Sequence, residues 1–581
     1  MIIEKKVLFS AQIFLFLTLL QNSMKRLIIS LLATFSAVSM FAGGIVTNTN
    51  QSAAFVRMPA QDAAIGIQAA YHNPAGLTKL ADGFHLQLSN QSIFQTKEIE
   101  STYFSLENKT YVGDVKAPLF PSFYAAYKTG KMAFSLGFNA VGGGGGAEYK
   151  TGLPSFEQDV SSIPASLKAA GIPTDDYSAD IYFSGSSVYW GLQFGISYEV
   201  SEALSLYAGA RYIMAKNTYE GHIHDIMIDP VRNLTALGQP NYTGEMVSAT
   251  VFFTDLAEAS TAASASAASG ASQMQPLING GVGGLTFAQA QAANAINSTQ
   301  RATMEGGLLA FGVSQTTING MTLAQAQATY SSISNDYATS ATTAAYNAAA
   351  TKDRDVDSEQ TGNTIAPILG AHLTLMEGAL NVGLKYEFKT PLEITNATVV
   401  DGTGMFTDGQ VSPAEMPSLL SVGVDYKVMD NLSLAIGYHQ YFDKSAKYGK
   451  TDANGDFITN ETLMDNNNWE LAVGLEYAVS DNFLLSGGWL KTSTGVTLAY
   501  QTDLSYSLNT NTMAFGARAQ VSPALAIDLG VMYTFYEDGE KDFAAESGIP
   551  AYKELYRKST FTAGIGFSYS IGATKTEKTV E

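Results

Sequence analysis

Few residue groups in this sequence could carry out chemistry, and none of them completes a known reactive motif. His222 and His224 have the side chains of metal ligands, but they lie at the end of an expected strand, where a structural role explains them. The residues Asp452 to Asp456 resemble the start of a calcium loop but lack the glutamate of loop position 12. The glycine run 142–146 is not followed by Lys and Ser or Thr, and no nucleophile-elbow motif occurs. We therefore predict a protein that is not an enzyme, with no metal site and no cofactor.

The composition excludes several other classes of protein. Among 581 residues, 53 are acidic and 33 are basic, and the net charge of −20 argues against a nucleic-acid binder. The absence of Cys excludes a disulfide scaffold and Cys-ligated zinc. Only 15% of the residues are charged, whereas 46% are hydrophobic, and no apolar run after residue 43 is long enough for a membrane-spanning helix. A transmembrane β-barrel is the class that fits.

The elements that would build such a barrel are visible as segments in which apolar residues alternate with polar or small ones. Residues 188–199 alternate in this way, Ser201 to Ala203 form a turn, and residues 204–212 continue the pattern. Five further hairpins have the same form, and single strands lie near residues 84–91 and 560–572. The additional hairpins pair 121–128 with 131–141, 366–375 with 379–389, 418–427 with 432–442, 469–479 with 483–491, and 512–521 with 525–536.

This pattern predicts an all-β transmembrane barrel of fourteen antiparallel strands, residues 84–572. The hairpin turns are short and the other connections are long, which is typical of outer-membrane barrels with periplasmic turns and external loops. Both chain ends are then expected in the periplasm. Charged residues of both signs fall on the inward side, which predicts a polar lumen that is either wet or plugged. These residues are Glu199, Arg211, Lys385, Glu387, Asp425, Glu470, Glu476, Arg518 and Asp528.

Residues 1–42 have the features of a signal region. Lys25 and Arg26 precede an apolar stretch that ends in small residues, and we place the cleavage site after Ala42. A second apolar run precedes Met24. Translation that starts at Met24 explains this doubling, and a membrane-tethered precursor is the alternative. At the other end of the chain, residues 573–581 form a polar tail.

The segment 43–83 lies between the signal region and the first strand, and we predict that it is a helical hatch inside the barrel. Its expected helical pieces are residues 51–55 and 58–67. Asn73-Pro74-Ala75-Gly76 follows, and Asn-Pro is a turn dipeptide. Taken alone this motif is only a turn, but its position before a fourteen-strand pattern makes it more specific.

With these residues the sequence resembles the long-chain fatty acid transporter family of outer-membrane barrels, the FadL type, which includes hydrocarbon transporters of the TodX type. The resemblance rests on residues 49–80, with support from Gly137-Phe138-Asn139 and residues 209–216. It implies a fourteen-stranded barrel with an N-terminal hatch and a gate formed by Asn73, Pro74 and Ala75. It also implies an inward bend of the third strand, which here contains Gly142, Gly143 and Gly144. Hydrophobic substrate would leave sideways through the wall.

Five inward side chains could line the lumen, although simple packing is an alternative for each of them. They are Tyr189, Tyr207, Ile213, Tyr441 and Met532. The expected partners are a hydrophobic, fatty-acid-like ligand, outer-membrane lipid and lipopolysaccharide, and the outer-membrane assembly machinery.

Residues 221–363 interrupt the barrel pattern and are rich in Ala, Ser, Thr and Gln. Residues 284–292 recur as residues 320–328, and Thr286 and Thr322 can each cap a helix. We predict an external insertion of two related helical hairpins, with partial disorder as the alternative. The leading function is passive outer-membrane transport of hydrophobic small molecules. A general diffusion porin, and an adhesin or receptor that the barrel only anchors, are the alternatives.

Overall fold

The computed structural model describes residues 45–452, 454–545 and 549–574 of the chain. The expected signal region 1–42 and the expected tail from residue 575 onwards lie outside the described residues. No helix in the described part of the chain is both long and apolar enough to cross a membrane.

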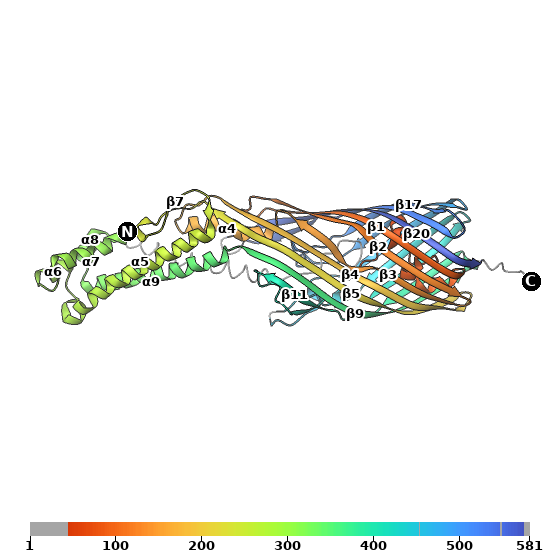
Figure 1. Cartoon of the computed structure of the whole chain (residues 1–581), viewed down its shortest axis with the longest axis horizontal. Helices are drawn as coiled ribbons and strands as arrows, with labels where there is room; N and C mark the ends of the chain where they lie inside the picture. Colours follow the sequence, from red (N-terminus) through yellow and green to blue (C-terminus); the bar gives the residue numbers. More distant parts are fainter. Residues whose placement is uncertain (1–44, 453, 546–548, 575–581) are drawn as a thin grey trace, which may run out of the picture. The chain divides into compact units, whose positions relative to one another are not determined.

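Fourteen long antiparallel strands in the described residues form a closed barrel, as the sequence predicted (Figure 1). Each strand pairs with the next, and β1 closes the ring because it pairs with β2 on one side and with β20 on the other. The strands are β1 (Asp82–Ser101), β2 (Thr110–Thr129), β3 (Met132–Tyr149), β4 (Tyr177–Ser201), β5 (Leu204–Ile228), β9 (Arg354–Leu375), β10 (Leu380–Glu387), β13 (Leu419–Met429), β14 (Leu432–Tyr441), β15 (Trp469–Ser480), β16 (Phe483–Ser493), β17 (Thr510–Gln520), β18 (Leu525–Tyr536) and β20 (Tyr552–Thr574).

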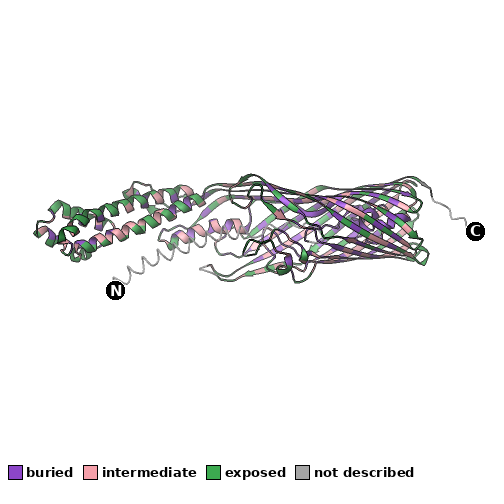
Figure 2. Ribbon diagram, turned by 90° about the horizontal axis from the view of Figure 1, so that it is seen from below, coloured by how far each residue is buried: buried purple, intermediate pink, exposed green. Residues whose placement is uncertain are grey.

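The alternation of side chains explains why these segments form a barrel wall. In β1 the polar residues Gln87 and Gln91 are buried, whereas Phe84, Leu88 and Phe94 are exposed on the outer face. Figure 2 shows the same alternation of buried and exposed residues along the neighbouring strands. A closed ring pairs the backbone groups of the wall with one another, so an apolar outer face can lie in lipid without unsatisfied backbone groups.

The six short turns lie where the sequence placed them, between strands that follow each other directly. They connect β2 to β3, β4 to β5, β9 to β10, β13 to β14, β15 to β16 and β17 to β18. The turn after β9 contains three successive residues with positive φ, Met376, Glu377 and Gly378. The other connections are long, and some of them contain short elements. These are β11 (Glu393–Asp401), β12 (Val411–Pro413), β19 (Gly539–Phe543), η5 (Asp443–Ser445) and η6 (Asn460–Thr462).

At the end with the long connections, several strands extend further than the alternation of the sequence indicated. β9 begins at Arg354 rather than at residue 366, and β20 begins at Tyr552 rather than at residue 560. We expected the insertion to extend to residue 363, but residues 354–363 already belong to β9. The extension of β9 contains Asp355, Asp357 and Glu359, so it has no apolar face by which sequence alone would reveal a strand.

Residues 159–180 and 223–353 form a second compact unit, which we describe by itself. It contains α5 (Ala249–Leu277), α6 (Phe287–Ala292), α7 (Ser298–Ala310), α8 (Gln315–Gly320) and α9 (Leu323–Ala350), together with most of α4 (Pro154–Ala169). The short strands β6 (Val231–Asn233), β7 (Asn241–Thr243) and β8 (Val247–Ser248) also lie there.

The repeat in this unit produces two helix starts of the same form. Thr286 caps α6 and Thr322 caps α9, and each forms a capping box with the glutamine three residues later. The long helices α5 and α9 pack closely, because Gly270 of α5 leaves room for the ring of Tyr330. The predicted caps are therefore confirmed, and the Ala-rich stretch is helical.

Candidate functional site

Residues 45–80 lie inside the barrel, and nearly all of the first thirty are buried. They contain α2 (Ser52–Arg57), α3 (Ala69–His72) and η1 (Pro74–Lys79). The expected helix over residues 58–67 is wrong, since this stretch consists of turns, bends and irregular backbone. Pro59 disfavours helical backbone at the residue before it, and Met58 is extended with φ −161° and ψ 111°.

The first contact between the hatch and the wall is apolar. Phe55 and Val56 of α2 pack in a buried cluster with Met532 of β18 and with alanines of β14, β15 and β17. The wall approaches very closely here, because a Cβ on Gly530 would lie 2.6 Å from the backbone nitrogen of Arg57. Glycine at that position of β18 therefore makes room for the hatch.

Arg57 at the end of α2 is held by two carboxylates of the wall. Its Nη1 lies 2.6 Å from Oε1 of Glu476, and its Nε lies 3.2 Å from Oδ1 of Asp528. Arg518 lies 3.3 Å from the other oxygen of Asp528. Arg57 and Asp528 are almost completely buried, and each also pairs with a second charge, Arg57 with Glu476 and Asp528 with Arg518.

A second polar contact centres on His439 of β14. Its Nε2 lies 2.8 Å from Oδ1 of Asp62 in the hatch, and its Nδ1 lies 2.9 Å from Oε2 of Glu470 in β15. Both ring nitrogens therefore lie within hydrogen-bond distance of carboxylate oxygens, one from the hatch and one from the wall. Glu470 also accepts hydrogen bonds from the hydroxyl groups of Tyr441 and of Thr49 in the hatch.

Tyr71 of α3 lies between two buried cations. The guanidinium carbon of Arg211 is 5.0 Å from the ring centroid of Tyr71, and the ammonium nitrogen of Lys385 is 4.4 Å from it. Lys385 also donates to the backbone oxygen of Tyr71 at 3.0 Å, and both cations pair with Glu387. The inward charges that the sequence predicted on β5 and β10 therefore hold the hatch from one side.

Asn73, the first residue of the predicted gate motif, connects the hatch to the wall. Its Nδ2 donates to the backbone oxygen of Ala64 and to Nδ1 of His372 in β9, each at 2.9 Å. The backbone of Asn73 has φ −144° and ψ 67°, and it ends α3 just before the short helix η1. Asn73 thus joins two parts of the hatch to one strand.

Pro74 and Ala75 contact other strands. Ser197 of β4 donates to the backbone oxygen of Pro74 at 2.6 Å, and Ala75 packs in a small buried cluster with Tyr207 and Ile368. Three successive residues of the motif therefore contact β9, β4 and β5. The motif therefore lies where the hatch contacts the inner side of the wall.

The third strand leaves its neighbour at the glycine run. β2 and β3 pair at Asp114 with Glu148 and again at Phe123 with Phe138, but not between these pairs. Residues 115–122 of β2 thus face residues 139–147 of β3, which is one residue more. Gly143 has φ +88°, which L side chains rarely adopt, and a Cβ there would lie 2.4 Å from the backbone oxygen of Ser187.

At this bend the backbone of β3 pairs with the first residues of the hatch, 46–48, instead of with β2. The backbone nitrogen of Asn48 donates to Val141 at 2.9 Å, and that of Gly143 donates to Val46 at 2.9 Å. Gly142 forms an isolated bridge with Thr47. The bent part of β3 therefore satisfies backbone groups with the hatch rather than with its neighbour in the wall.

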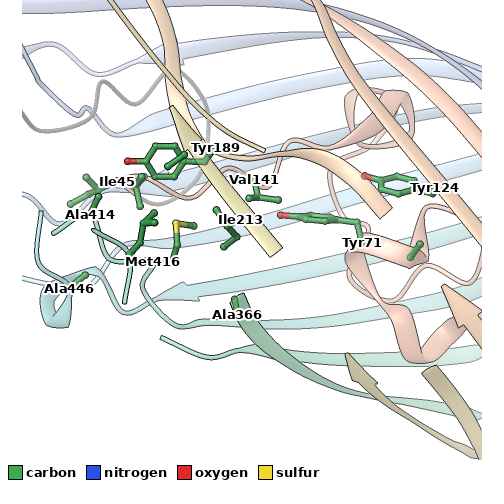
Figure 3. Packing of buried hydrophobic residues seen from close by; sticks show 14 of the residues in the cluster. Ile45, Tyr71, Tyr124, Val141, Tyr189, Ile213, Ala366, Ala414, Met416 and Ala446 are labelled. Atoms are coloured by element: carbon green, nitrogen blue, oxygen red, sulfur yellow. The ribbon is translucent and has the colours of Figure 1, made fainter. Parts of the chain in front are cut away.

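An apolar cluster lies inside the barrel around these residues (Figure 3). It includes Val141 of the bend, Tyr71 of the hatch, and Tyr189 and Ile213, two of the predicted lining residues. The other three lining candidates contact the hatch. Tyr207 packs on Ala75, Met532 packs with Phe55, and Tyr441 bonds to Thr49 and Glu470.

No protein-family model matches the sequence, and no curated protein matches it. Among solved structures, the chain is similar to a FadL homologue of Pseudomonas aeruginosa, with a TM-score of 0.52, 13% identity, and coverage of 91% of this chain and 99% of that chain. The toluene transporters TodX of Pseudomonas putida and TbuX of Ralstonia pickettii give TM-scores of 0.48 and 0.45, with 12% and 14% identity. These matches cover 92% and 90% of this chain and 99% and 98% of theirs. This chain has the FadL-type barrel fold.

Sequence reasoning missed the two histidines that hold the hatch of this FadL-type barrel. His372 and His439 both lie on the inward side of their strands, but nothing local indicates that their partners are Asn73 and Asp62, more than 290 positions away. The sequence offered one signal for them, because each histidine falls on the inward side of its strand two residues after a glycine, Gly370 or Gly437.

Proposed function

We propose that this protein is a passive outer-membrane transporter of hydrophobic small molecules, such as long-chain fatty acids or similar lipidic compounds. The ligand enters from the end with the long connections, passes the apolar cluster and leaves sideways between β2 and β3. In this proposal the short turns and both chain ends face the periplasm, and the outer face contacts outer-membrane lipid and lipopolysaccharide. The chain is inserted by the outer-membrane assembly machinery.

The observation that supports this proposal most strongly is the interrupted pairing of β2 and β3 beside a seated hatch. A hatch held by Arg57, Asp62 and Tyr71 blocks the straight path through the lumen. In this proposal the side path is the place where β2 and β3 do not pair, at residues 139–147 of β3. The surrounding cluster contains Val141 and Tyr189, so this path suits an apolar solute better than a sugar or an ion.

The general porin alternative conflicts with the hatch, since a seated plug prevents free diffusion of water-soluble molecules. The FadL homologue, TodX and TbuX are named as transporters or as a homologue of one, and none is named as an enzyme. Transport rather than catalysis is therefore the function that we propose.

Deletion of Gly143 tests the side path. This change removes the extra residue of β3, so that the register of Asp114 with Glu148 becomes continuous with that of Phe123 with Phe138. We expect β2 and β3 to pair without interruption and uptake of labelled oleate by cells to fall to the level of cells without the protein.

The matched control is deletion of Gly171, which also has positive φ but precedes β4 in a turn with no neighbouring atoms around its Cβ position. This control should leave uptake unchanged, and both variants should migrate as folded barrels in unheated gels. Normal uptake by a folded variant that lacks Gly143 would refute the side path.

A further inference from the structure

Asp443 is a buried acid in the connection between β14 and β15. It lies in the short helix η5 and is 0% exposed. Its Oδ1 accepts a hydrogen bond from the hydroxyl of Tyr448 at 3.1 Å, and the carboxyl group also accepts one from the backbone nitrogen of Ile45. Its Oδ2 has no hydrogen-bond partner among the described residues. One oxygen of this acid therefore lacks a donor.

No lysine, arginine or histidine of the described residues pairs with Asp443. Lys444, the next residue, donates instead to the backbone oxygen of Asp465 at 3.0 Å. Burial therefore raises the pKa of Asp443 from its ordinary value of 3.8 to about 7. Acidic side chains are almost never fully buried in proteins unless they are paired. A positive charge next to Asp443 would remove the cost of burying it.

Ile45 is the first described residue of the chain, and it lies against this acid rather than at the surface. Ile45 is 1% exposed and belongs to the same buried apolar cluster as Ala446 and Tyr448 of the Asp443 connection (Figure 3). If the mature chain began at Ile45, its backbone nitrogen would be an α-ammonium group. Such a group offers three N–H donors and a full positive charge, whereas a peptide nitrogen offers one neutral donor.

The residues before Ile45 fit a processing site that ends there. Signal peptides are cleaved after small residues at positions −3 and −1. Cleavage after Gly44 places Ala42 and Gly44 at these positions, whereas cleavage after Ala42 places Met40 at position −3. The small-residue pattern therefore favours a mature chain that begins two residues later than the signal region alone led us to expect.

We propose that the protein is processed between Gly44 and Ile45 and that the new α-ammonium group of Ile45 pairs with the Asp443 carboxylate. A signal peptidase hydrolyses this peptide bond with one water molecule, which leaves a carboxylate on Gly44 and a protonated amino group on Ile45. The ammonium group then donates to the carboxylate of Asp443, Oδ2 included. Processing thus creates a buried ion pair that the uncleaved precursor cannot form.

The ion pair would hold the start of the hatch. Residues 46–48 follow Ile45 directly, and Val46 and Asn48 form backbone hydrogen bonds with Gly143 and Val141 at the bend of β3. An ion pair at Ile45 therefore connects this segment to the connection that follows β14. In the uncleaved precursor the hatch would lack this contact, whichever solute the barrel carries.

The intact mass of the full-length protein purified from outer membranes tests the processing site. The proposal predicts the mass of residues 45–581. Cleavage after Ala42 would add the mass of two glycine residues. A mature chain that begins at Gly43, or at any residue other than Ile45, would overturn the proposal.

Labelling of the α-amino group with an amine-reactive ester at pH 8 tests the ion pair, with mass spectrometry of the N-terminal peptide as the readout. We expect the N-terminus of folded wild type to react about tenfold or more slowly than that of Asp443→Asn, because a charge-assisted hydrogen bond contributes that factor. The amino group must lose a proton before it reacts, and the carboxylate holds that proton in place. The side chain of Ile45 is the same in both proteins.

Asp503→Asn is the matched control. Asp503 is also a buried acid in a long connection, but it accepts a hydrogen bond from the backbone nitrogen of Ser155 at 2.8 Å. This variant should react as slowly as wild type. Equal rates for folded wild type and folded Asp443→Asn would overturn the ion pair. If Asp443→Asn does not fold, a wild-type terminus that reacts as fast in the folded as in the heat-denatured protein would overturn it.

Both measurements are made without a ligand, so their outcome is separate from that of the transport proposal.

Discussion

Asn73 is the residue through which a local turn becomes a contact between hatch and wall. The double variant Asn73→Ala with Pro74→Ala loses the bonds to Ala64 and His372 and the fixed φ of proline. We expect docking of the hatch to weaken by about 2 kcal/mol and uptake of labelled oleate to fall, with normal surface expression.

An equally drastic change in a short turn provides the control for this variant. Asp481→Ala with Asn482→Ala alters the turn between β15 and β16, far from the gate motif in sequence, and should leave uptake normal. If both double variants take up oleate at the wild-type rate, the gate assignment is wrong.

His72 makes the seated hatch sensitive to acid. Its ring stacks on Phe55 at 5.8 Å and bonds to the backbone oxygen of Gln51, and burial lowers the pKa of His72 from its ordinary value of 6.5 to about 3. A displaced, hydrated hatch would bind a proton below pH 6.5, whereas the seated hatch would not. The seated state should therefore lose about 1.4 kcal/mol per pH unit between pH 6.5 and 3 from this residue.

Single-channel recording in planar bilayers measures this effect. Open events should become more frequent as the pH falls below 6.5, and His72→Phe, which keeps the ring contact but cannot titrate, should show a smaller increase. The same pH dependence in both proteins would show that groups other than His72 are responsible.

At the scale of the elements, the strands of the wall form their ladders without the hatch. The ring closes through β1 and β20, and none of its ladders needs residues before Asp82. We expect removal of residues 43–80 to leave a folded barrel with a larger conductance in planar bilayers, because the lumen is then open. An unchanged, low conductance in the folded variant would show that another segment blocks the lumen.

The elements also show what sequence alone could and could not predict. Alternation and turn residues are local, so they indicated the strand pairs, the six short turns and the caps at Thr286 and Thr322. The contact of Asp62 with His439 depends on packing between distant segments and has no local signal. The helix expected over residues 58–67 was wrong, and Pro59 accounts only for the extended backbone of Met58 before it.

At the scale of the whole molecule, a plugged barrel with an interrupted wall suits one class of solute. In the proposed function, the hatch prevents water-soluble molecules from crossing, and the bend of β3 is the route that an apolar molecule would use without loss of hydration. Both features must act together, since an open lumen would also admit sugars and an uninterrupted wall would retain the ligand.

Parallel uptake of labelled oleate and of a labelled disaccharide by cells that express the full-length protein tests this central claim most directly. The account predicts that the protein increases oleate uptake above that of cells without it and leaves disaccharide entry unchanged. Entry of the disaccharide without an increase in oleate uptake would contradict it and would identify the barrel as a general pore.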